Sequence, residues 1–183
     1  MGALLNSFLL VFFSEMGDKT QLLSLLLVAR YKKRGAILAG VFVATILNHA
    51  VASAAGNWLA GLLSPVFLKW TLVLFFLGFA FWVLIPDKEG DVPIKGTYGV
   101  FLTTTVAFFL AEMGDKTQLA TVALGAKYSD VMFVTLGSTL GMLLSNALAV
   151  FWGERLLSVV PMKWIRVLAS VLFIFFAIVV AMR

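Results

Sequence analysis

Apolar runs long enough to cross a lipid bilayer recur through this chain with almost no sequence between them. A bilayer core of about 30 Å needs about 20 residues of helix for each crossing. We place the predicted crossings at residues 4–29, 36–62, 67–85, 97–125, 131–153 and 163–182. The chain is 62% hydrophobic and 13% charged, whereas about a quarter of the residues in a soluble domain are charged. The sequence therefore predicts an all-α membrane protein with six transmembrane helices and no separate soluble domain.

One eight-residue segment occurs twice. The residues EMGDKTQL at 15–22 return unchanged at 112–119, 97 positions later. The offset also relates weaker similarities, so each half is predicted to be a three-helix unit. Three is an odd number, so the second unit enters the membrane from the opposite side, which predicts inverted repeats typical of secondary transporters. We expect the first repeat at 1–85, a linker at 86–96 and the second repeat at 97–183.

The positive charges indicate orientation in the membrane rather than binding to nucleic acid, although the net charge is +5. Cytoplasmic loops collect Lys and Arg. If the N-terminus lies outside, nine of these residues face the cytoplasm, and three face outward: Lys69, Lys127 and Arg183. Both termini are therefore predicted to lie outside the cytoplasm. The N-terminus lacks the basic segment and cleavage site of a secretory signal, so the first run is expected to remain a helix.

The repeated segment puts acidic residues into the membrane, where charged side chains are costly. Four acids, Glu15, Asp18, Glu112 and Asp115, lie in the apolar runs with two lysines, Lys19 and Lys116. Inverted symmetry is expected to bring the two sets together near the midplane. Four carboxylates and two ammonium groups leave two negative charges, which match one divalent cation or two protons. The lysines would balance charge or take part in coupling.

Spacing within the segment predicts converging oxygen atoms. Glu15 and Asp18 are three residues apart, and Glu112 and Asp115 repeat this spacing, so each pair would share a helix face. The intervening glycines, Gly17 and Gly114, allow a kink or an unwound turn that exposes carbonyls. An alternative for the lysines stays open, because each also lies four residues after its own glutamate and can form a local ion pair there.

Carboxylate and amide oxygens are hard ligands that suit Mg²⁺, Ca²⁺ or Mn²⁺. The chain has no cysteine and one histidine, which disfavours zinc or copper. His49 is interpreted as a packed side chain rather than a proton carrier. Candidate additional ligands are Gln21, Gln118, Asn48, Asn146, Met16 and Met113. The amides can instead bond between helices, and the methionines can simply pack.

Other features limit the function classes. The Phe-rich runs at 75–81 and 173–176 are expected to face lipid. No Gly-rich phosphate loop or Walker lysine occurs, so ATP is not the expected energy source and no cofactor is expected. An intramembrane aspartyl protease also pairs Gly with Asp in a membrane helix, but the lysines and the symmetric duplication disfavour this enzyme. A passive cation channel is a closer rival, since acidic rings also select cations.

The duplicated pattern Glu-x-Gly-Asp-Lys-Thr resembles that of the Gdt family of cation transporters, which includes bacterial manganese exporters and Golgi and chloroplast members. Both copies match at every fixed position of that pattern, and the resemblance spans essentially the whole chain. It implies transport of Mn²⁺, and of Ca²⁺ in some members, in exchange for protons. It also implies that the four motif acids, Glu15, Asp18, Glu112 and Asp115, bind the metal.

The eukaryotic members carry an N-terminal targeting region and a longer linker, which this chain lacks. The cytoplasmic membrane of a prokaryote is therefore the expected location. We expect alternating access around a midplane site, in which cytoplasmic Mn²⁺ binds the carboxylates and protons from outside displace it. Repulsion between empty carboxylates makes proton uptake the natural counter-reaction. A Ca²⁺/proton antiporter of the same architecture and a passive divalent-cation channel remain the alternatives.

Overall fold

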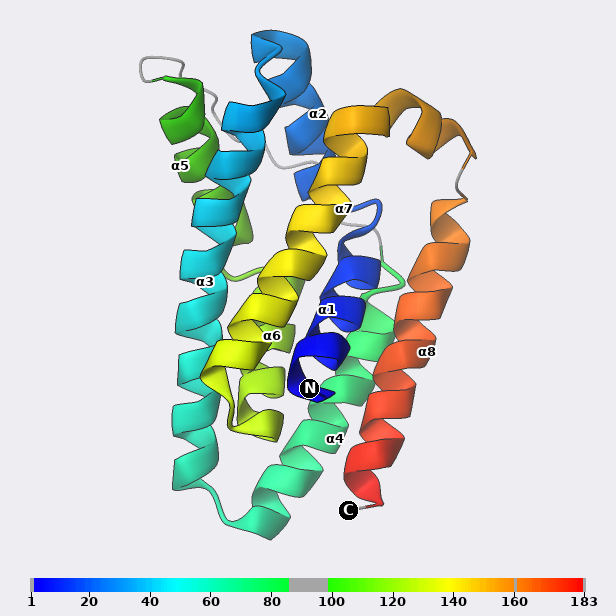
Figure 1. The fold of residues 1–183 in the computed structure, drawn as a ribbon. Coiled ribbons are helices and arrows are strands. Elements are labelled where there is room, and N and C mark those ends of the chain that lie inside the picture. The colour runs from blue at the N-terminus through cyan, green and yellow to red at the C-terminus, as the bar shows by residue number, and fades with distance from the viewer. Residues whose placement is uncertain (1, 86–98, 160, 183) are drawn as a thin grey trace.

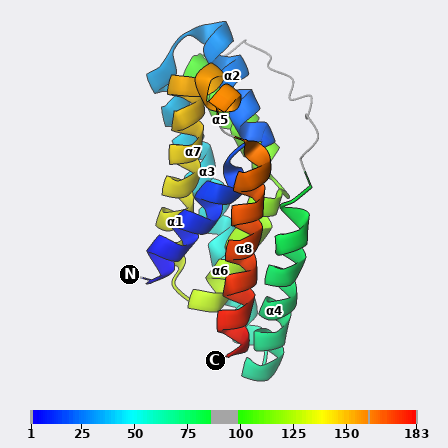
Figure 2. The same ribbon diagram turned by 90° about the vertical axis from the view of Figure 1, so that its right-hand side faces the viewer.

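The computed structural model describes residues 2–85, 99–159 and 161–182, and all regular structure within these ranges is helical. The helices form an elongated bundle (Figures 1 and 2). In chain order they are α1 (Gly2–Glu15), α2 (Lys19–Tyr31), α3 (Arg34–Leu62), α4 (Pro65–Trp82), α5 (Val100–Glu112), α6 (Lys116–Tyr128), α7 (Val131–Val159) and α8 (Met162–Ala181).

Helix bounds recur with the offset of the sequence repeat. α2 and α6, and likewise α3 and α7, begin and end 97 residues apart. In Figure 1 the equivalent helices run in opposite directions: α3 descends and α7 ascends, and α4 ascends while α8 descends. The expected linker at 86–96 lies outside the described residues. α3 and α7, and likewise α4 and α8, thus point in opposite directions in this view.

Two of the six predicted helices are interrupted. Within the described ranges, four helices are long and apolar enough to cross a membrane: Arg34–Leu62, Pro65–Trp82, Val131–Gly153 and Lys163–Ala181. The runs predicted as crossings at 4–29 and 97–125, in which Gly17 and Gly114 allow a kink or an unwound turn, each form two short helices in succession, α1 with α2 and α5 with α6. The chain breaks at residues 16–18 and 113–115 because a glycine there adopts a backbone conformation that a helix does not use.

Small residues let the central helices approach one another closely. A Cβ atom added at Gly137 or Gly141 of α7 would overlap the backbone carbonyl of Leu4 or Phe8 in α1. α3 and α7 are joined by a hydrogen bond of 2.6 Å between the hydroxyls of Ser53 and Thr135. Such close packing is the usual role of Gly and Ser in membrane helices, and it holds α1 and α3 against α7.

The prediction that the Phe-rich runs face lipid is wrong for part of each run. Phe76 and Phe173 are buried between α4 and α8, with ring centroids 6.4 Å apart. Phe79 also packs against Phe173, at 5.6 Å. Phe75 and Phe175 are exposed, as expected. A helix completes one turn every 3.6 residues, so a continuous aromatic run presents one face to the neighbouring helix and the other outward.

Candidate metal centre

The first break brings the motif residues out of regular helix. α1 ends at Glu15, Gly17 has φ +80°, and Asp18 is the N-cap of α2, where its carboxylate accepts a hydrogen bond of 2.8 Å from the backbone N–H of Lys19. The prediction that Glu15 and Asp18 share a helix face is therefore wrong. The acids instead lie on the two sides of a turn.

The second break repeats this geometry. Glu112 ends α5, Gly114 has φ +77°, and Asp115 is the N-cap position of α6. The motif glutamines hold both turns, since Gln118 Oε1 accepts from the N–H of Gly114 at 2.7 Å and Gln21 Oε1 accepts from Gly17 at 2.9 Å. The repeated EMGDKTQ segment thus encodes a helix end, a glycine turn, and a glutamine that binds the N–H freed by the turn.

Replacing Gly114 with alanine is expected to lower the free energy of unfolding by about 1–2 kcal/mol, the usual cost of a left-handed backbone for a residue with a Cβ. No atom lies within 4 Å of a Cβ built there, so the cost comes from the backbone alone. Thermal unfolding in detergent measures it. Gly61→Ala is the matched control, because Gly61 also has open space around it but lies within α3. Equal melting temperatures for the two variants would contradict the prediction.

Three carboxylates meet between the two breaks. Glu15, Glu112 and Asp115 each offer an oxygen, and these oxygens all lie within 4.8 Å of one another. Glu15 and Glu112 are 0% and 1% exposed, and Asp115 is 7% exposed. Residues 97 or more positions apart in the sequence are thus brought into one buried acidic group, in which both repeats take part.

The hydrogen bonds of these carboxylates differ. Glu15 Oε2 accepts from the hydroxyl of Thr20 at 2.8 Å, and its Oε1 accepts from the hydroxyl of Thr117 of the other repeat. Within the described part of the chain, both oxygens of Glu112 and Oδ2 of Asp115 lack a hydrogen-bond partner. The sequence analysis includes these threonines in the repeated motif but not among the candidate site residues, although their position directly after each motif lysine was a usable signal. The site therefore contains buried carboxylate oxygens free to bind a cation.

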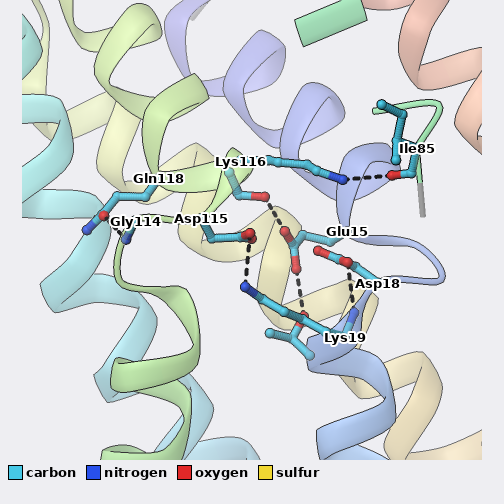
Figure 3. Close-up of polar contacts among 10 residues, drawn as sticks. Glu15, Asp18, Lys19, Ile85, Gly114, Asp115, Lys116 and Gln118 are labelled. Carbon is cyan, nitrogen blue, oxygen red and sulfur yellow. Dashed lines mark hydrogen bonds and ion pairs between the residues drawn. The ribbon is translucent and has the colours of Figure 1, made fainter. Parts of the chain in front are cut away.

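Lys19 crosses to the other repeat. Its Nζ lies 3.0 Å from Oδ1 of Asp115 (Figure 3). The structure therefore has Lys19 in an ion pair with Asp115 of the other repeat, not in a local ion pair with Glu15. Lys116 points differently, since its Nζ donates to the backbone carbonyl of Ile85 at 2.8 Å. Lys19 thus places an ammonium group directly at the carboxylate cluster.

Asp18 lies at the edge of this cluster. It is 9% exposed and lines a small pocket with Lys116 and Arg166. Arg166 of α8 reaches the same turn, where its Nη2 lies 3.5 Å from the carbonyl of Gly17. Three of the four predicted acids therefore come together. The fourth, Asp18, lies in the turn after Glu15, where its side chain caps α2.

The other candidate ligands have partners or positions of their own. Gln21 Nε2 donates to the carbonyl and hydroxyl of Ser145, both at 2.8 Å. Asn48 Nδ2 donates to the carbonyl of Phe109 at 3.2 Å, and Asn146 Oδ1 accepts from Ser24 at 2.8 Å. The methionines differ from each other, since Met16 is buried and Met113 is 57% exposed. Gln21, Asn48 and Asn146 thus join helices around the acidic cluster.

The cluster suits a hard divalent cation in size and charge. Oxygens bound to one ion at about 2.0–2.6 Å can lie at most about twice that distance apart, and a separation within 4.8 Å meets this limit for a Ca²⁺-sized or slightly smaller ion. Three ionised carboxylates beside one ammonium group leave two negative charges. Carboxylates this close together and out of water need positive charge nearby, which a divalent cation or protons can supply.

Long apolar helices and acids buried between them define a helical membrane protein of the kind that moves ions, since ionisable groups inside such bundles mark ion pathways. Residues 3–91 and 100–183 match the family described as divalent cation/proton antiporter GDT1. The chain therefore belongs to the GDT1 family. The members of this family are transporters rather than enzymes.

Relatives come from bacteria and plants. A Vibrio cholerae protein named as a candidate manganese exporter is 48% identical over 183 residues, which cover 99% of this chain and 91% of that protein. GDT1-like protein 5 of Arabidopsis thaliana is 30% identical over 97% of this chain and 96% of its own length. A GDT1-like protein of Synechocystis is 28% identical over 93% and 92%. No solved structure matches the chain.

Proposed function

We propose that this protein exports Mn²⁺ from the cytoplasm in exchange for protons. The observation that carries the proposal is the buried group of three carboxylates, contributed by both repeats, whose oxygens lie within 4.8 Å of one another. Membership of a divalent cation/proton antiporter family supports the exchange. The name of the Vibrio cholerae relative supports manganese as the cation and export as the direction.

The proposed architecture has six crossings in two inverted repeats, residues 1–85 and 97–183, joined by a linker at 86–96. α1 has 14 residues and α2 has 13, so each is only about 20 Å long and they span the bilayer core only in succession. α5 and α6 make the equivalent crossing. The opposite directions of α3 and α7 support the inversion (Figure 1).

In the proposed site, Glu15, Glu112 and Asp115 hold Mn²⁺ through carboxylate oxygens, and Asp18 joins them from the neighbouring turn. Lys19 occupies the position beside Asp115 when the metal is absent. Cytoplasmic Mn²⁺ displaces the ammonium group and any protons on the carboxylates. After the site turns outward, protons take the place of the metal, and two protons balance the charge of one Mn²⁺.

We place the protein in the cytoplasmic membrane of a prokaryote with both termini outside. The α2–α3 turn, which carries Lys32 and Lys33, would then face the cytoplasm, as the bias of positive charge towards that side requires. Both chain ends lie towards the opposite end of the bundle from this turn (Figures 1 and 2), which supports the assignment.

Reconstitution into liposomes tests the function directly. With Mn²⁺ inside and a more acidic solution outside, we expect Mn²⁺ efflux together with proton influx, detected by a metal indicator and a pH-sensitive dye. Imposing or reversing the pH gradient should drive Mn²⁺ against its own gradient, which a channel cannot do. Ca²⁺ is the comparison ion. Metal flux without proton movement would contradict exchange, and transport of Ca²⁺ alone would contradict the choice of Mn²⁺.

A further inference from the structure

Two equivalent helix pairs differ in this structure. By the 97-residue offset, the pair α3 and α6 corresponds to the pair α7 and α2. At the end distant from the acidic cluster, α3 and α6 touch backbone to backbone: a Cβ added at Gly56 would overlap the carbonyl of Val122, and one at Gly125 would overlap the carbonyl of Ser53. No side chain separates the two helices there.

The equivalent ends of α7 and α2 are apart. Gly153 corresponds to Gly56, but the three atoms nearest to a Cβ added at Gly153 all belong to the side chain of Leu25, and the overlap at 1.9 Å is with its terminal Cδ2. A groove of about 580 Å³ lies here. Its lining comes mainly from α2 and α7 and includes Leu25, Val28, Ala29, Val150 and Gly153. The pair that is closed in one half is therefore open in the other.

Nearer to the acidic cluster the difference is reversed. α2 is bound to α7 by Gln21 with Ser145 and by Ser24 with Asn146. The equivalent pairs, Gln118 with Asn48 and Thr121 with His49, are not hydrogen-bonded in this way within the described residues. Thr121 donates to the carbonyl of Thr117 in its own helix, and neither ring nitrogen of the buried His49 has a hydrogen-bond partner within the described residues. His49 is the equivalent of Asn146, so the exchanged arrangement would give it Thr121 as a partner.

We infer that the protein alternates between two states in which its halves exchange arrangements, and that this structure is one of them. The helix pairs α3–α6 and α2–α7 are the two gates, and Gly56 and Gly153 are their contact points. The inference rests on the proposed function and its inverted repeats, in which each half can adopt the conformation of the other. In the present state the α2–α7 gate is open on the cytoplasmic side and the α3–α6 gate is closed. In the other state Gly153 packs against the backbone of Leu25, and Gly56 separates from Val122.

Alanine at the two glycines tests this exchange. Gly153→Ala needs only a rotation of Leu25 in the present state, but its methyl group would overlap a backbone carbonyl in the other. We expect at least a tenfold loss of Mn²⁺ transport, with binding of Mn²⁺, followed by thermal shift, retained. Gly61→Ala, at a glycine with open space around it in α3, is the control and should transport at the normal rate. Normal transport by Gly153→Ala would overturn the inference.

Cysteine labelling follows the gates without a transport assay, and the chain contains no cysteine of its own. Ala29 is exposed in the groove, whereas its equivalent Ala126 is 7% exposed against α3. We expect a maleimide to label Ala29→Cys strongly and Ala126→Cys weakly in an otherwise unchanged protein. Adding Gly56→Ala, which disfavours the closed α3–α6 contact, should reverse this order. Adding Gly153→Ala should preserve it.

The two assays separate failure of the gates from failure of the proposed function. If neither the unchanged protein nor Gly61→Ala moves Mn²⁺, the proposed function fails and labelling alone decides the gates. If Gly56→Ala does not fold, the transport and labelling of Gly153→Ala decide them. Labelling of Ala126→Cys that stays weak in folded Gly56→Ala would overturn the inference whatever the transported ion.

Discussion

Replacing Glu112 with glutamine is expected to abolish Mn²⁺ transport while leaving the fold intact. Both Glu112 oxygens lie in the acidic cluster without a hydrogen-bond partner among the described residues, so the substitution breaks no bond there. It removes one negative charge and one metal-binding oxygen. Loss of a residue that merely supports a metal ligand costs about 10- to 100-fold in metal affinity or activity, and loss of a ligand should cost at least as much.

Flux in liposomes and thermal unfolding with and without Mn²⁺ measure this together. The melting temperature of the metal-free variant should not fall, because a buried amide is less costly than a buried unpaired charge. Asp130→Asn is the control: Asp130 caps the start of α7 by accepting from the N–H of Phe133 at 3.1 Å, and asparagine caps equally well. Normal Mn²⁺ transport by Glu112→Gln would exclude Glu112 as a ligand.

The duplication in the sequence predicts much of the helix order. The same 97-residue offset relates the bounds of α2 to those of α6, and the bounds of α3 to those of α7. The repeat in the sequence therefore recurs in the positions of these helices. Glycine between the two motif acids indicates where the helices can break, since only glycine takes a positive φ without strain. The lengths of the runs did not reveal the breaks, because apolar residues continue on both sides of each one.

The contacts of the site were less predictable, because they depend on distances across the bundle. Lys19 has Glu15 four residues before it, and sequence spacing offers that pair first. The break at Gly17 removes the helical geometry on which such pairing depends, and Lys19 reaches Asp115 instead. For the same reason Gln21 and Gln118 look like ligands in sequence, whereas in the structure their amide oxygens accept bonds from the glycine N–H groups.

The ion pair between Lys19 and Asp115 gives the second large effect. Replacing Lys19 with methionine removes the ammonium group that pairs with Asp115 in the cluster. Both oxygens of buried Asp115 then lack a partner among the described residues. Breaking a fully buried ion pair from one side costs about 3–5 kcal/mol, and the cost here is smaller because the side chain of Lys19 is 24% exposed. We expect a lower melting temperature without metal, at least about tenfold tighter Mn²⁺ binding, equal to about 1.4 kcal/mol, and slower transport because release becomes harder.

Thermal unfolding over a range of Mn²⁺ concentrations measures both parts, since a ligand that binds only the folded state raises stability in proportion to the logarithm of its concentration over Kd. Mn²⁺ should restore more stability to Lys19→Met than it adds to the unchanged protein, because the metal supplies the positive charge that the lysine provided. Lys19→Arg keeps a positive charge at this position and should retain most of the stability and the weaker binding. A loss of stability in Lys19→Met that Mn²⁺ does not reverse would mean that Lys19 holds the two repeats together without competing for the metal.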